Sequence, residues 1–326
     1  MVDATAPQHQ RLMVHAARRY HLDDASKVAI AQELGISRFK VARLLEEARE
    51  QGIVRIDIVD PSAGRDHLES RLRNAFGLSH AAVVDVDDLE PDTAQDELAR
   101  RAADLMRRLA QPTDVIGLPW SRMVAKAVRH FDGLPPVPIV QLSGALDLPA
   151  YESSPVDVVR DAARLTGGEP RVFYAPLVAD DAAAADVIRA QASVAGTLDD
   201  AKHCSLALVG VGGWSQGEST LYDLATDDER RELARLCVVG EIAGSLFDAS
   251  GAPVDAGLSA RLVSMRPDDL RLITHVVAVS HGRARAAAVA AGIRGGYLTS
   301  IVVDIPLAQE LLAEHAGGAS ESSTHE

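Results

Sequence analysis

Residues 26–55 constrain the fold more than any other stretch of this chain. They begin Ser-Lys-Val-Ala-Ile-Ala-Gln-Glu-Leu-Gly-Ile-Ser-Arg-Phe-Lys-Val-Ala-Arg-Leu-Leu and end, after a helical tail, in Gly-Ile-Val-Arg. The spacing of the apolar residues predicts two short helices on either side of a Gly35-Ile-Ser37 turn. That layout is typical of a helix-turn-helix, whose second helix fits a DNA major groove.

Capping and breaking residues support the ends of these helices. Ser26 and Ser37 each precede a helical run, where a serine hydroxyl can accept an otherwise unpartnered backbone N–H. Gly35 suits the left-handed conformation that ends a helix. We also expect a first helix at 8–20, a short strand or wing at 53–59 and a linker at 60–64. The side chains expected to face inward are Val28, Ile30, Ala31, Leu34, Val41, Leu44, Leu45 and Ala48.

The charge of the chain is unevenly distributed. A formal net charge of −14 by itself argues against binding of nucleic acid. The first 60 residues, which we call the head, carry nine basic and nine acidic side chains, so the negative balance belongs to the remainder, the body. Within 26–43 four basic residues accompany only one acidic residue, Glu33. We therefore expect DNA contact to be confined to the head.

The third helix of the head is predicted to read double-stranded DNA. Arginine can bond two acceptors of one guanine, and lysine and serine can bond phosphates or base edges. The start of the second helix suits phosphate. The alternative is a three-helix bundle whose charges form only a solvated face. The expected DNA-binding residues are Ser26, Lys27, Ser37, Arg38, Phe39, Lys40 and Arg43.

Beyond the head the pattern changes to alternating strands and helices. This predicts a larger α/β domain with a mostly parallel sheet covered on both faces. The predicted domains are 1–60, 61–314 and a disordered tail at 315–326, with an inserted hairpin near 240–254 that turns at Ser250-Gly251. The expected strands are 81–86, 114–117, 138–142, 172–175, 206–210, 275–279 and 298–303, and the expected helices are 68–76, 93–109, 121–131, 155–165, 226–236, 283–293 and 306–314.

The head also carries a family resemblance. The residues Ile30-Ala31, Leu34-Gly35-Ile36-Ser37-Arg38, Lys40-Val41, Arg43-Leu44-Leu45, Ala48-Arg49 and Gly52-Ile53-Val54 resemble the head of the SorC/DeoR-type sugar-binding transcriptional regulators, the SorC family. The resemblance continues more patchily to Leu312. It implies an effector domain related in fold to sugar-phosphate isomerases and deaminases. It also implies a sugar, polyol or sugar-phosphate effector and operator binding as a homodimer or homotetramer.

Ligands of parallel sheets bind beyond the carboxyl ends of the strands, where loops meet helix N-termini. The loop Gly117–Arg122, which contains Trp120 and Ser121, follows a predicted strand, and its hydroxyl and arginine suit a phosphate or carboxylate. Pro119 stands where the resembling family is richer in glycine, and it removes one backbone donor. An ordinary turn with Trp120 packed inside would explain the same residues.

Two further loops are rich in glycine. Gly144, within Leu-Ser-Gly-Ala at 142–145, resembles a strand-end glycine of the family. Gly210 and Gly212 lie in Val-Gly-Val-Gly-Gly, which is similar to a dinucleotide-binding fingerprint, but Ser215 stands where its third glycine belongs. We therefore expect no dinucleotide cofactor and assign this loop to the effector pocket.

A fourth loop, Ser280–Arg285, includes His281 and Gly282. In the resembling family a lysine that contacts the effector usually stands at the position of Arg285. Arginine keeps the positive charge and can grip an anion with two N–H groups, but it cannot form a Schiff base. His281 is either a donor to the ligand or an ordinary loop histidine.

Three acidic residues complete the candidate set. The resemblance places an acidic residue at Glu241, where a carboxylate can accept sugar hydroxyls. Asp248 is either a second ligand group or a turn cap beside Gly251, and we favour the turn. Asp304 matches a family aspartate that orients a loop, although capping of the following helix explains it equally well.

The remaining composition bears on location and cofactors. Cys204 and Cys237 lack metal-like spacing and suggest a reducing cytoplasm. Long uncharged apolar runs and a basic segment followed by an apolar core are both missing, so we expect no membrane span and no signal peptide. We expect a cytoplasmic, nucleoid-associated protein that holds neither a cofactor nor a metal.

An effector-controlled DNA-binding regulator of carbohydrate or polyol catabolism explains these patterns best. One alternative is a sugar-phosphate isomerase or deaminase fused to a DNA-binding head. His281, Asp248 and Glu241 are available for such chemistry, but they form no compact acid–base signature, so we assign no catalytic residue. The other alternative, an architectural DNA binder, leaves the large body unexplained.

Overall fold

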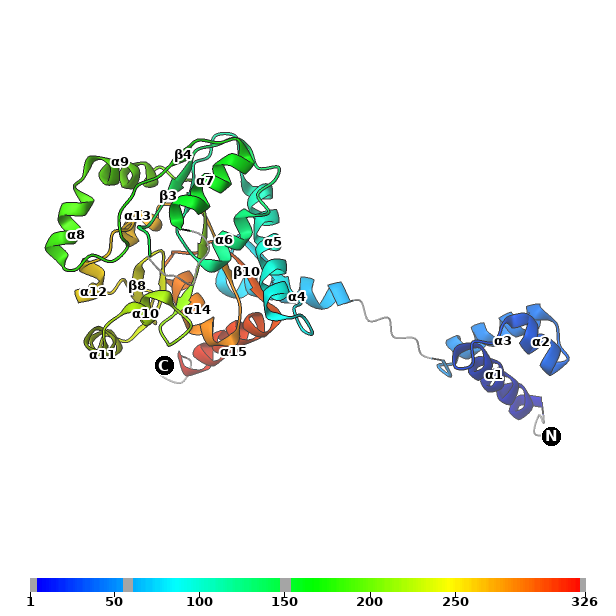
Figure 1. The fold of residues 1–326 in the computed structure, drawn as a ribbon. Coiled ribbons are helices and arrows are strands. Elements are labelled where there is room, and N and C mark those ends of the chain that lie inside the picture. Colours follow the sequence, from blue (N-terminus) through cyan, green and yellow to red (C-terminus); the bar gives the residue numbers. More distant parts are fainter. Residues whose placement is uncertain (1–4, 55–60, 147–153, 323–326) are drawn as a thin grey trace. The chain divides into compact units, whose positions relative to one another are not determined.

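The computed structural model describes residues 5–54, 61–146 and 154–322 (Figure 1). The chain divides into two compact units, Met1–Pro61 and Ser62–Glu326. Each unit has its own hydrophobic core.

The head contains the helices α1 (Thr5–His21), α2 (Lys27–Leu34) and α3 (Arg38–Glu50). The Ser26 hydroxyl accepts a hydrogen bond from Ala29 N at 3.2 Å, and the Ser37 hydroxyl accepts one from Lys40 N at 3.2 Å. Gly35 ends α2 in the left-handed conformation, with φ of +63°. The turn between α2 and α3 is therefore fixed by the three residues that the sequence indicated.

The core of the head forms where its three helices meet. Among the residues predicted to face inward, Val28 is wrong: it is 50% exposed, because it stands two residues from the buried Ile30 and so on the other side of α2. The strand or wing predicted at 53–59 falls mostly outside the described residues. Ile53 and Val54 are partly buried against the core. The buried residues are Met13, Ala16, Ala17, Ile30, Ala31, Val41, Leu44, Leu45 and Ala48.

The body is built on a seven-stranded sheet in the order β1-β10-β9-β5-β2-β3-β4, in which every neighbouring pair is parallel. This confirms the predicted α/β class. A second sheet, β6-β7-β8, is antiparallel. The strands are β1 (His80–Val84), β2 (Ile116–Leu118), β3 (Ile139–Gln141), β4 (Pro170–Arg171), β5 (Leu206–Gly210), β6 (Gly212–Gly213), β7 (Val238–Ile242), β8 (Ser245–Asp248), β9 (His275–Ser280) and β10 (Ser300–Asp304).

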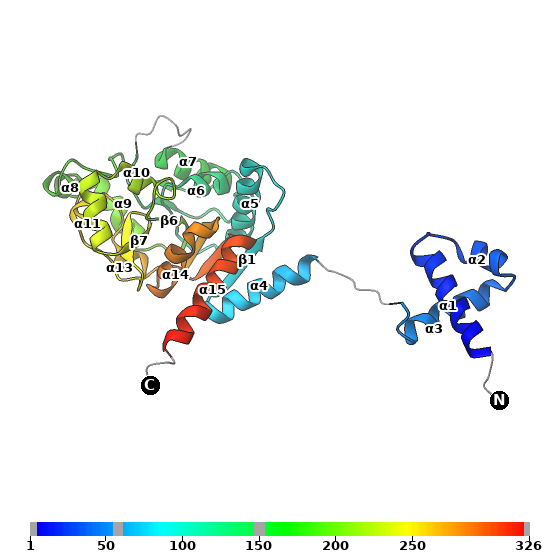
Figure 2. The same cartoon turned by 90° about the horizontal axis from the view of Figure 1, so that it is seen from below.

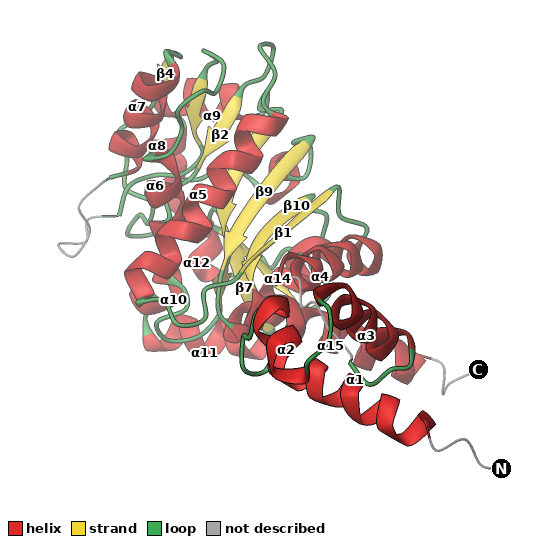
Figure 3. Cartoon of the chain, turned by 90° about the vertical axis from the view of Figure 1, so that its right-hand side faces the viewer, coloured by secondary structure: helices red, strands yellow, loops and turns green. Residues whose placement is uncertain are grey.

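Helices cover both faces of the parallel sheet (Figure 3). Along β5, Leu206 and Leu208 enter the core shared with α5, α6 and α7, whereas Ala207 and Val209 enter the core shared with α14 and α15. This alternation follows from the two-residue period of a strand. The helices are α4 (Pro61–Phe76), α5 (Pro91–Leu109), α6 (Arg122–Val128), α7 (Pro155–Thr166), α8 (Ala182–Arg189), α9 (Ala192–Ala201), α10 (Thr220–Leu224), α11 (Asp227–Arg235), α12 (Gly257–Ala260), α13 (Pro267–Leu270), α14 (Ala286–Arg294) and α15 (Ile305–Ser322), with a 3₁₀ turn at Arg283–Arg285.

Several boundaries differ from the predictions. The expected linker at 60–64 begins outside the described residues, and Pro61 onward already belongs to α4. Residues 315–322, expected to be disordered, extend α15, and the His315 ring lies 5.1 Å from that of Phe76 (Figure 2). The predicted hairpin is present as β7 and β8, which are joined by a turn at Ala243-Gly244, where both φ angles are positive. Such a pair is what a two-residue hairpin turn requires. The turn predicted at Ser250-Gly251 is also present, after β8, where Gly251 N donates to the Asp248 carbonyl oxygen at 2.9 Å.

Candidate functional site

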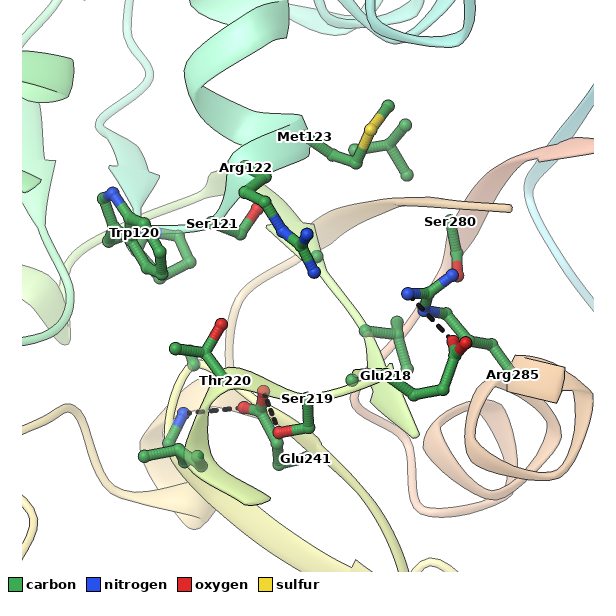
Figure 4. Close-up of a pocket in the computed structure, with 18 of the residues that line it drawn as sticks. Trp120, Ser121, Arg122, Met123, Glu218, Ser219, Thr220, Glu241, Ser280 and Arg285 are labelled. Atoms are coloured by element: carbon green, nitrogen blue, oxygen red, sulfur yellow. Dashed lines mark hydrogen bonds and ion pairs between the residues drawn. The ribbon is translucent and has the colours of Figure 1, made fainter. Parts of the chain in front are cut away.

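A pocket of about 390 Å³ opens at the carboxyl ends of β2, β5 and β9 (Figure 4). Its wall comes from separate parts of the chain: the β2–α6 loop, the turn after β5, the segment before α10, the β7–β8 hairpin and the loop after β9. This is the edge at which parallel sheets bind ligands. Of the predicted effector residues, the structure brings together Trp120, Ser121, Arg122, Gly210, Gly212, Glu241, His281, Gly282 and Arg285.

Gly210, which ends β5, and Gly212, which begins β6, leave room for neighbouring side chains in the pocket wall. A Cβ on Gly210 would lie 2.7 Å from the Ser121 hydroxyl. A Cβ on Gly212 would lie 2.6 Å from a Glu241 carboxylate oxygen and 2.9 Å from Ser219 Cβ. Because Gly212 pairs with Glu241 in the antiparallel sheet, the β6–β7 register delivers that carboxylate to the pocket.

Glu241 is held by two donors. The Ser219 hydroxyl donates to Glu241 Oε1 at 3.3 Å, and Gly244 N donates to Oε2 at 3.3 Å (Figure 4). Burial raises the pKa of the Glu241 carboxyl, while these two hydrogen bonds oppose the rise. The side chain can accept ligand hydroxyls when it is ionised.

Arg285 is already engaged inside the pocket. Its Nη2 lies 2.9 Å from Glu218 Oε2, and its Nη1 donates to the carbonyl oxygen of His281 at 2.6 Å (Figure 4). Burial lowers the pKa of Arg285, and Glu218 partly offsets that effect. Burial likewise lowers the pKa of His281, with Arg285 as the next cause, which favours a neutral imidazole.

Asp304 fixes the loop that carries these two residues. Its Oδ2 accepts from Gly282 N at 2.9 Å, and its Oδ1 accepts from Leu307 N at 3.0 Å. The two roles considered for Asp304 are therefore both fulfilled: it orients the loop after β9 and also bonds the first turn of α15.

The β2–α6 loop contributes Trp120, Ser121 and Arg122. The Ser121 hydroxyl accepts from Val124 N at 3.0 Å and caps α6, and Trp120 N donates to the Ser143 hydroxyl at 3.3 Å. Arg122 is exposed, its guanidinium points toward the middle of the pocket, and it has no ion pair within the described residues (Figure 4). The main group that this loop presents to a ligand is therefore the Arg122 guanidinium.

Three predicted effector residues lie away from the pocket. A Cβ on Gly144 would come within 2.5 Å of the Pro176 carbonyl oxygen, so this glycine serves close packing of two segments. Gly117 lies within β2, where a Cβ would meet the Leu142 side chain at 2.9 Å. Asp248 accepts from Ser250 N at 2.8 Å and from the Ser250 hydroxyl at 2.6 Å, so it caps a turn.

The segment before α10 was not predicted. Glu218, Ser219 and Thr220 line the pocket, although their sequence reads as an ordinary polar loop. A local signal did exist, since Ser219 N-caps α10 by accepting from Tyr222 N at 3.3 Å. The sequence does not show that this segment meets the loop after β9, because the partner of Glu218 there, Arg285, lies 67 positions further along the chain.

The predicted DNA-binding residues occupy the exposed side of α2 and α3. Arg38, Phe39 and Lys40 are exposed, and the Phe39 side chain is 85% exposed. Neither Arg38 nor Lys40 forms an ion pair with another described residue. Arg43 differs, because its Nε lies 3.3 Å from Glu47 Oε1 in the next turn. Lys27 Nζ lies 5.5 Å from the centre of the Tyr20 ring.

Comparison with known proteins identifies the class. Residues 60–313 match a family model described as "Putative sugar-binding domain". The chain is 27% identical over 308 residues to the deoxyribonucleoside regulator of Bacillus subtilis (strain 168), covering 94% of this chain and 98% of the relative. It is 28% identical over 315 residues to the sorbitol operon regulator of Klebsiella pneumoniae, covering 93% and 98%.

A solved structure agrees along almost the whole length. The crystal structure of the full-length sorbitol operon regulator SorC from Klebsiella pneumoniae superposes with a TM-score of 0.72 at 27% identity, covering 93% of this chain and 98% of that one. The chain belongs to the family with this sugar-binding domain, and its curated relatives are SorC- and DeoR-type transcriptional regulators, as the sequence predicted. Across the described helices, none is long and apolar enough to cross a membrane.

Proposed function

We propose that the chain is a DNA-binding transcriptional regulator of a carbohydrate or polyol catabolic operon, controlled by a small sugar, polyol or sugar phosphate. The observation that carries the proposal is the pairing of two features in one chain: a cationic helix face in the head and a polar pocket at the strand ends of the body. The names of the relatives, a deoxyribonucleoside regulator and a sorbitol operon regulator, support it.

In this proposal α2, Gly35 and α3 form a helix-turn-helix, and α3 lies in the major groove. Its first turn, Arg38 to Lys40, faces base edges and phosphates, because the N-terminal residues of a recognition helix reach furthest into the groove. Ser26, Lys27 and Ser37 contact phosphates. Since one head makes few contacts, operator binding requires paired heads, and we assign a homodimer or homotetramer. This places the protein with DNA in the cytoplasm.

The body then converts ligand binding into a change of operator affinity. That conversion requires the effector to bind the DNA-competent and DNA-incompetent states with different affinities. Arg122, Glu218, Glu241 and Arg285 are the polar groups that we assign to the effector. A fold relationship of the body to sugar-phosphate isomerases and deaminases remains part of the proposal. We assign no catalytic residue, because Glu241 and Arg285 are both held by neighbouring groups.

Two measurements test the proposal. Gel shifts with duplexes from the regions flanking its own gene should show a retained band at low ionic strength that weakens steeply with salt. A thermal-shift screen of pentoses, hexoses, polyols and their phosphates should find a ligand that raises the melting temperature, because preferential binding to the folded state stabilises it. The same ligand should change the gel shift. The absence of any retained band would contradict the DNA-binding role.

A further inference from the structure

We propose that the pocket is built for an uncharged polyhydroxylated ligand, a sugar or sugar alcohol without a phosphate group, because Glu218 already serves as the counter-ion of Arg285. The inference rests on the proposed function and narrows the class of its effector. In the lining of the pocket, Arg285 and Glu218 form an ion pair before any ligand binds.

Both terminal nitrogens of the Arg285 guanidinium already lie against oxygen atoms of the protein. One terminal nitrogen lies 2.9 Å from the Glu218 carboxylate and the other donates to the His281 carbonyl oxygen. Both side chains are largely buried, at 13% and 28% exposed. A phosphate that bound both terminal nitrogens of Arg285 would compete with Glu218, and displacing Glu218 would leave its carboxylate without a counter-ion.

The charge of the lining is balanced. Arg122 and Arg285 are opposed by Glu218 and Glu241, and the low pKa of His281 keeps its ring neutral at pH 7. When Glu241 is ionised, a phosphate dianion would therefore enter a pocket with no net positive charge and face two carboxylates. Transfer of such an ion from water needs a surplus of compensating charge, which this lining does not supply.

Two successive positions on the β2–α6 side offer a ligand no free backbone N–H. Pro119 has no N–H, and Trp120 N donates to the Ser143 hydroxyl. Across the pocket, the Ser219 hydroxyl donates to Glu241. The polar atoms nearest the cavity are thus largely committed to one another.

Ligand hydroxyl groups can bond to the side chains of the lining that still have free donors or acceptors. Glu218 and Glu241 can accept from ligand hydroxyls, and the exposed Arg122 can donate to them. Ser280 is 3% exposed and lines the pocket beside Arg285, and its hydroxyl has no hydrogen-bond partner among the described residues (Figure 4). A polyol both donates and accepts, so it satisfies carboxylates and the unpartnered hydroxyl without adding charge.

The test compares matched ligand pairs on the full-length protein. Isothermal titration calorimetry measures each polyol or sugar from the thermal-shift screen against its own phosphate ester, at constant ionic strength. Wild type should bind the parent at least about tenfold more tightly than the ester. Glu218→Gln frees Arg285 and should reverse this order, and it should also bind inorganic phosphate, which wild type should not.

Glu97→Gln is the matched control. It removes the same charge from another Glu–Arg pair, with Arg100 on the surface of α5, and should leave every affinity unchanged. Tighter binding of an ester than of its parent by wild type would overturn the inference and leave the proposed regulator intact. Unchanged phosphate binding by a folded Glu218→Gln variant would also overturn it. If neither member of any pair bound, the proposed function would fail with it.

Discussion

The head and the body treat their cationic side chains in opposite ways. On α3, Arg38 and Lys40 stand in solvent without an ion pair among the described residues, and an 85% exposed phenylalanine lies between them. In the pocket, Arg285 is largely buried and lies against Glu218. A surface that receives a polyanion can leave its cations solvated, because the partner brings the opposite charge. A buried cation needs an oppositely charged partner within the protein even without ligand, because an unpaired buried charge destabilises the fold.

The largest effect should follow from removing the unpaired cations of the head. Arg38→Ala combined with Lys40→Ala should lower affinity for flanking-region duplexes by about 100-fold or more and reduce the salt dependence by roughly two units of slope. The reason is that both side chains release counter-ions from DNA without first breaking a contact within the protein. Fluorescence anisotropy at several salt concentrations measures both quantities.

Arg43→Ala provides the control within the same helix. Since Arg43 already lies against Glu47, its removal should weaken binding less than the loss of either unpaired cation. If Arg43→Ala and Arg38→Ala lowered DNA affinity equally, the ion pair of Arg43 with Glu47 in the free protein would not determine how much each arginine contributes to DNA binding.

Removing the paired cation of the body should affect a different property. Arg285→Ala should lower effector affinity by about 100-fold, because the buried Glu218 carboxylate would lose the ion pair that holds it where it can accept ligand hydroxyls. Salt-sensitive DNA binding should remain. Calorimetry with the ligand found by the screen and anisotropy with DNA separate the two effects. Arg231→Ala, on the exposed side of α11, is the control and should change neither. A normal effector response from Arg285→Ala would show that the pocket is misplaced.

The contrast between the two regions also decides what the sequence could predict. In the head, the determining signals lie within a few residues of what they determine: Ser26 and Ser37 cap the helix that follows each, and Gly35 ends the helix before it. The paired carboxylate of Arg43 lies four residues away. The second and third helices of the head and the turn between them were therefore predicted, apart from the exposure of Val28, whereas the DNA-binding residues stay a prediction.

In the body, the sequence pattern predicted strands but did not predict which distant loops contact one another. β5 was predicted at its observed bounds because four consecutive apolar residues, all buried in the structure, lead into a glycine-rich loop. Two-residue strands such as β4 leave too short a pattern to place. Glu218 was missed because its partner Arg285 lies 67 positions further along the chain, and only the fold brings the two segments to one pocket. Asp248 was included because its turn lies close in sequence to the β7–β8 hairpin.

Phe39 is an apolar side chain on the exposed side of α3. Phe39 gains nothing from its position in the free head, where 85% of it faces solvent. We expect it to contact a thymine methyl group, so Phe39→Ala should lower affinity for the preferred sequence by about tenfold and leave the salt dependence unchanged. Duplexes selected from a random library, tested with thymine and with uracil, measure the effect. Wild type should discriminate between them, whereas the variant should not. Discrimination by both proteins would assign the methyl contact elsewhere.

The smallest effect concerns acid, to which the two regions should respond with opposite sign. The pKa of Glu33 in the head is lowered by its hydrogen bonds with His15 and Arg19, so its contribution to stability is present above its ordinary value of 4.5 and is lost as pH falls through the lowered pKa. Burial raises the pKa of Glu241, so its contribution is present below 4.5 and is lost as pH rises through the raised pKa.

Urea unfolding followed by tryptophan fluorescence reports the body alone, because both tryptophans, Trp120 and Trp214, lie there. Hydrogen exchange of the Ile30 amide reports the head. Glu241→Gln should flatten the gain in body stability on acidification from pH 7, because a neutral amide has no proton to bind. Glu33→Gln should flatten the loss of protection in the head below pH 4.5. The same sign of response in both regions would contradict the opposite pKa shifts of the exposed Glu33 carboxyl in the head and the buried Glu241 carboxyl in the body.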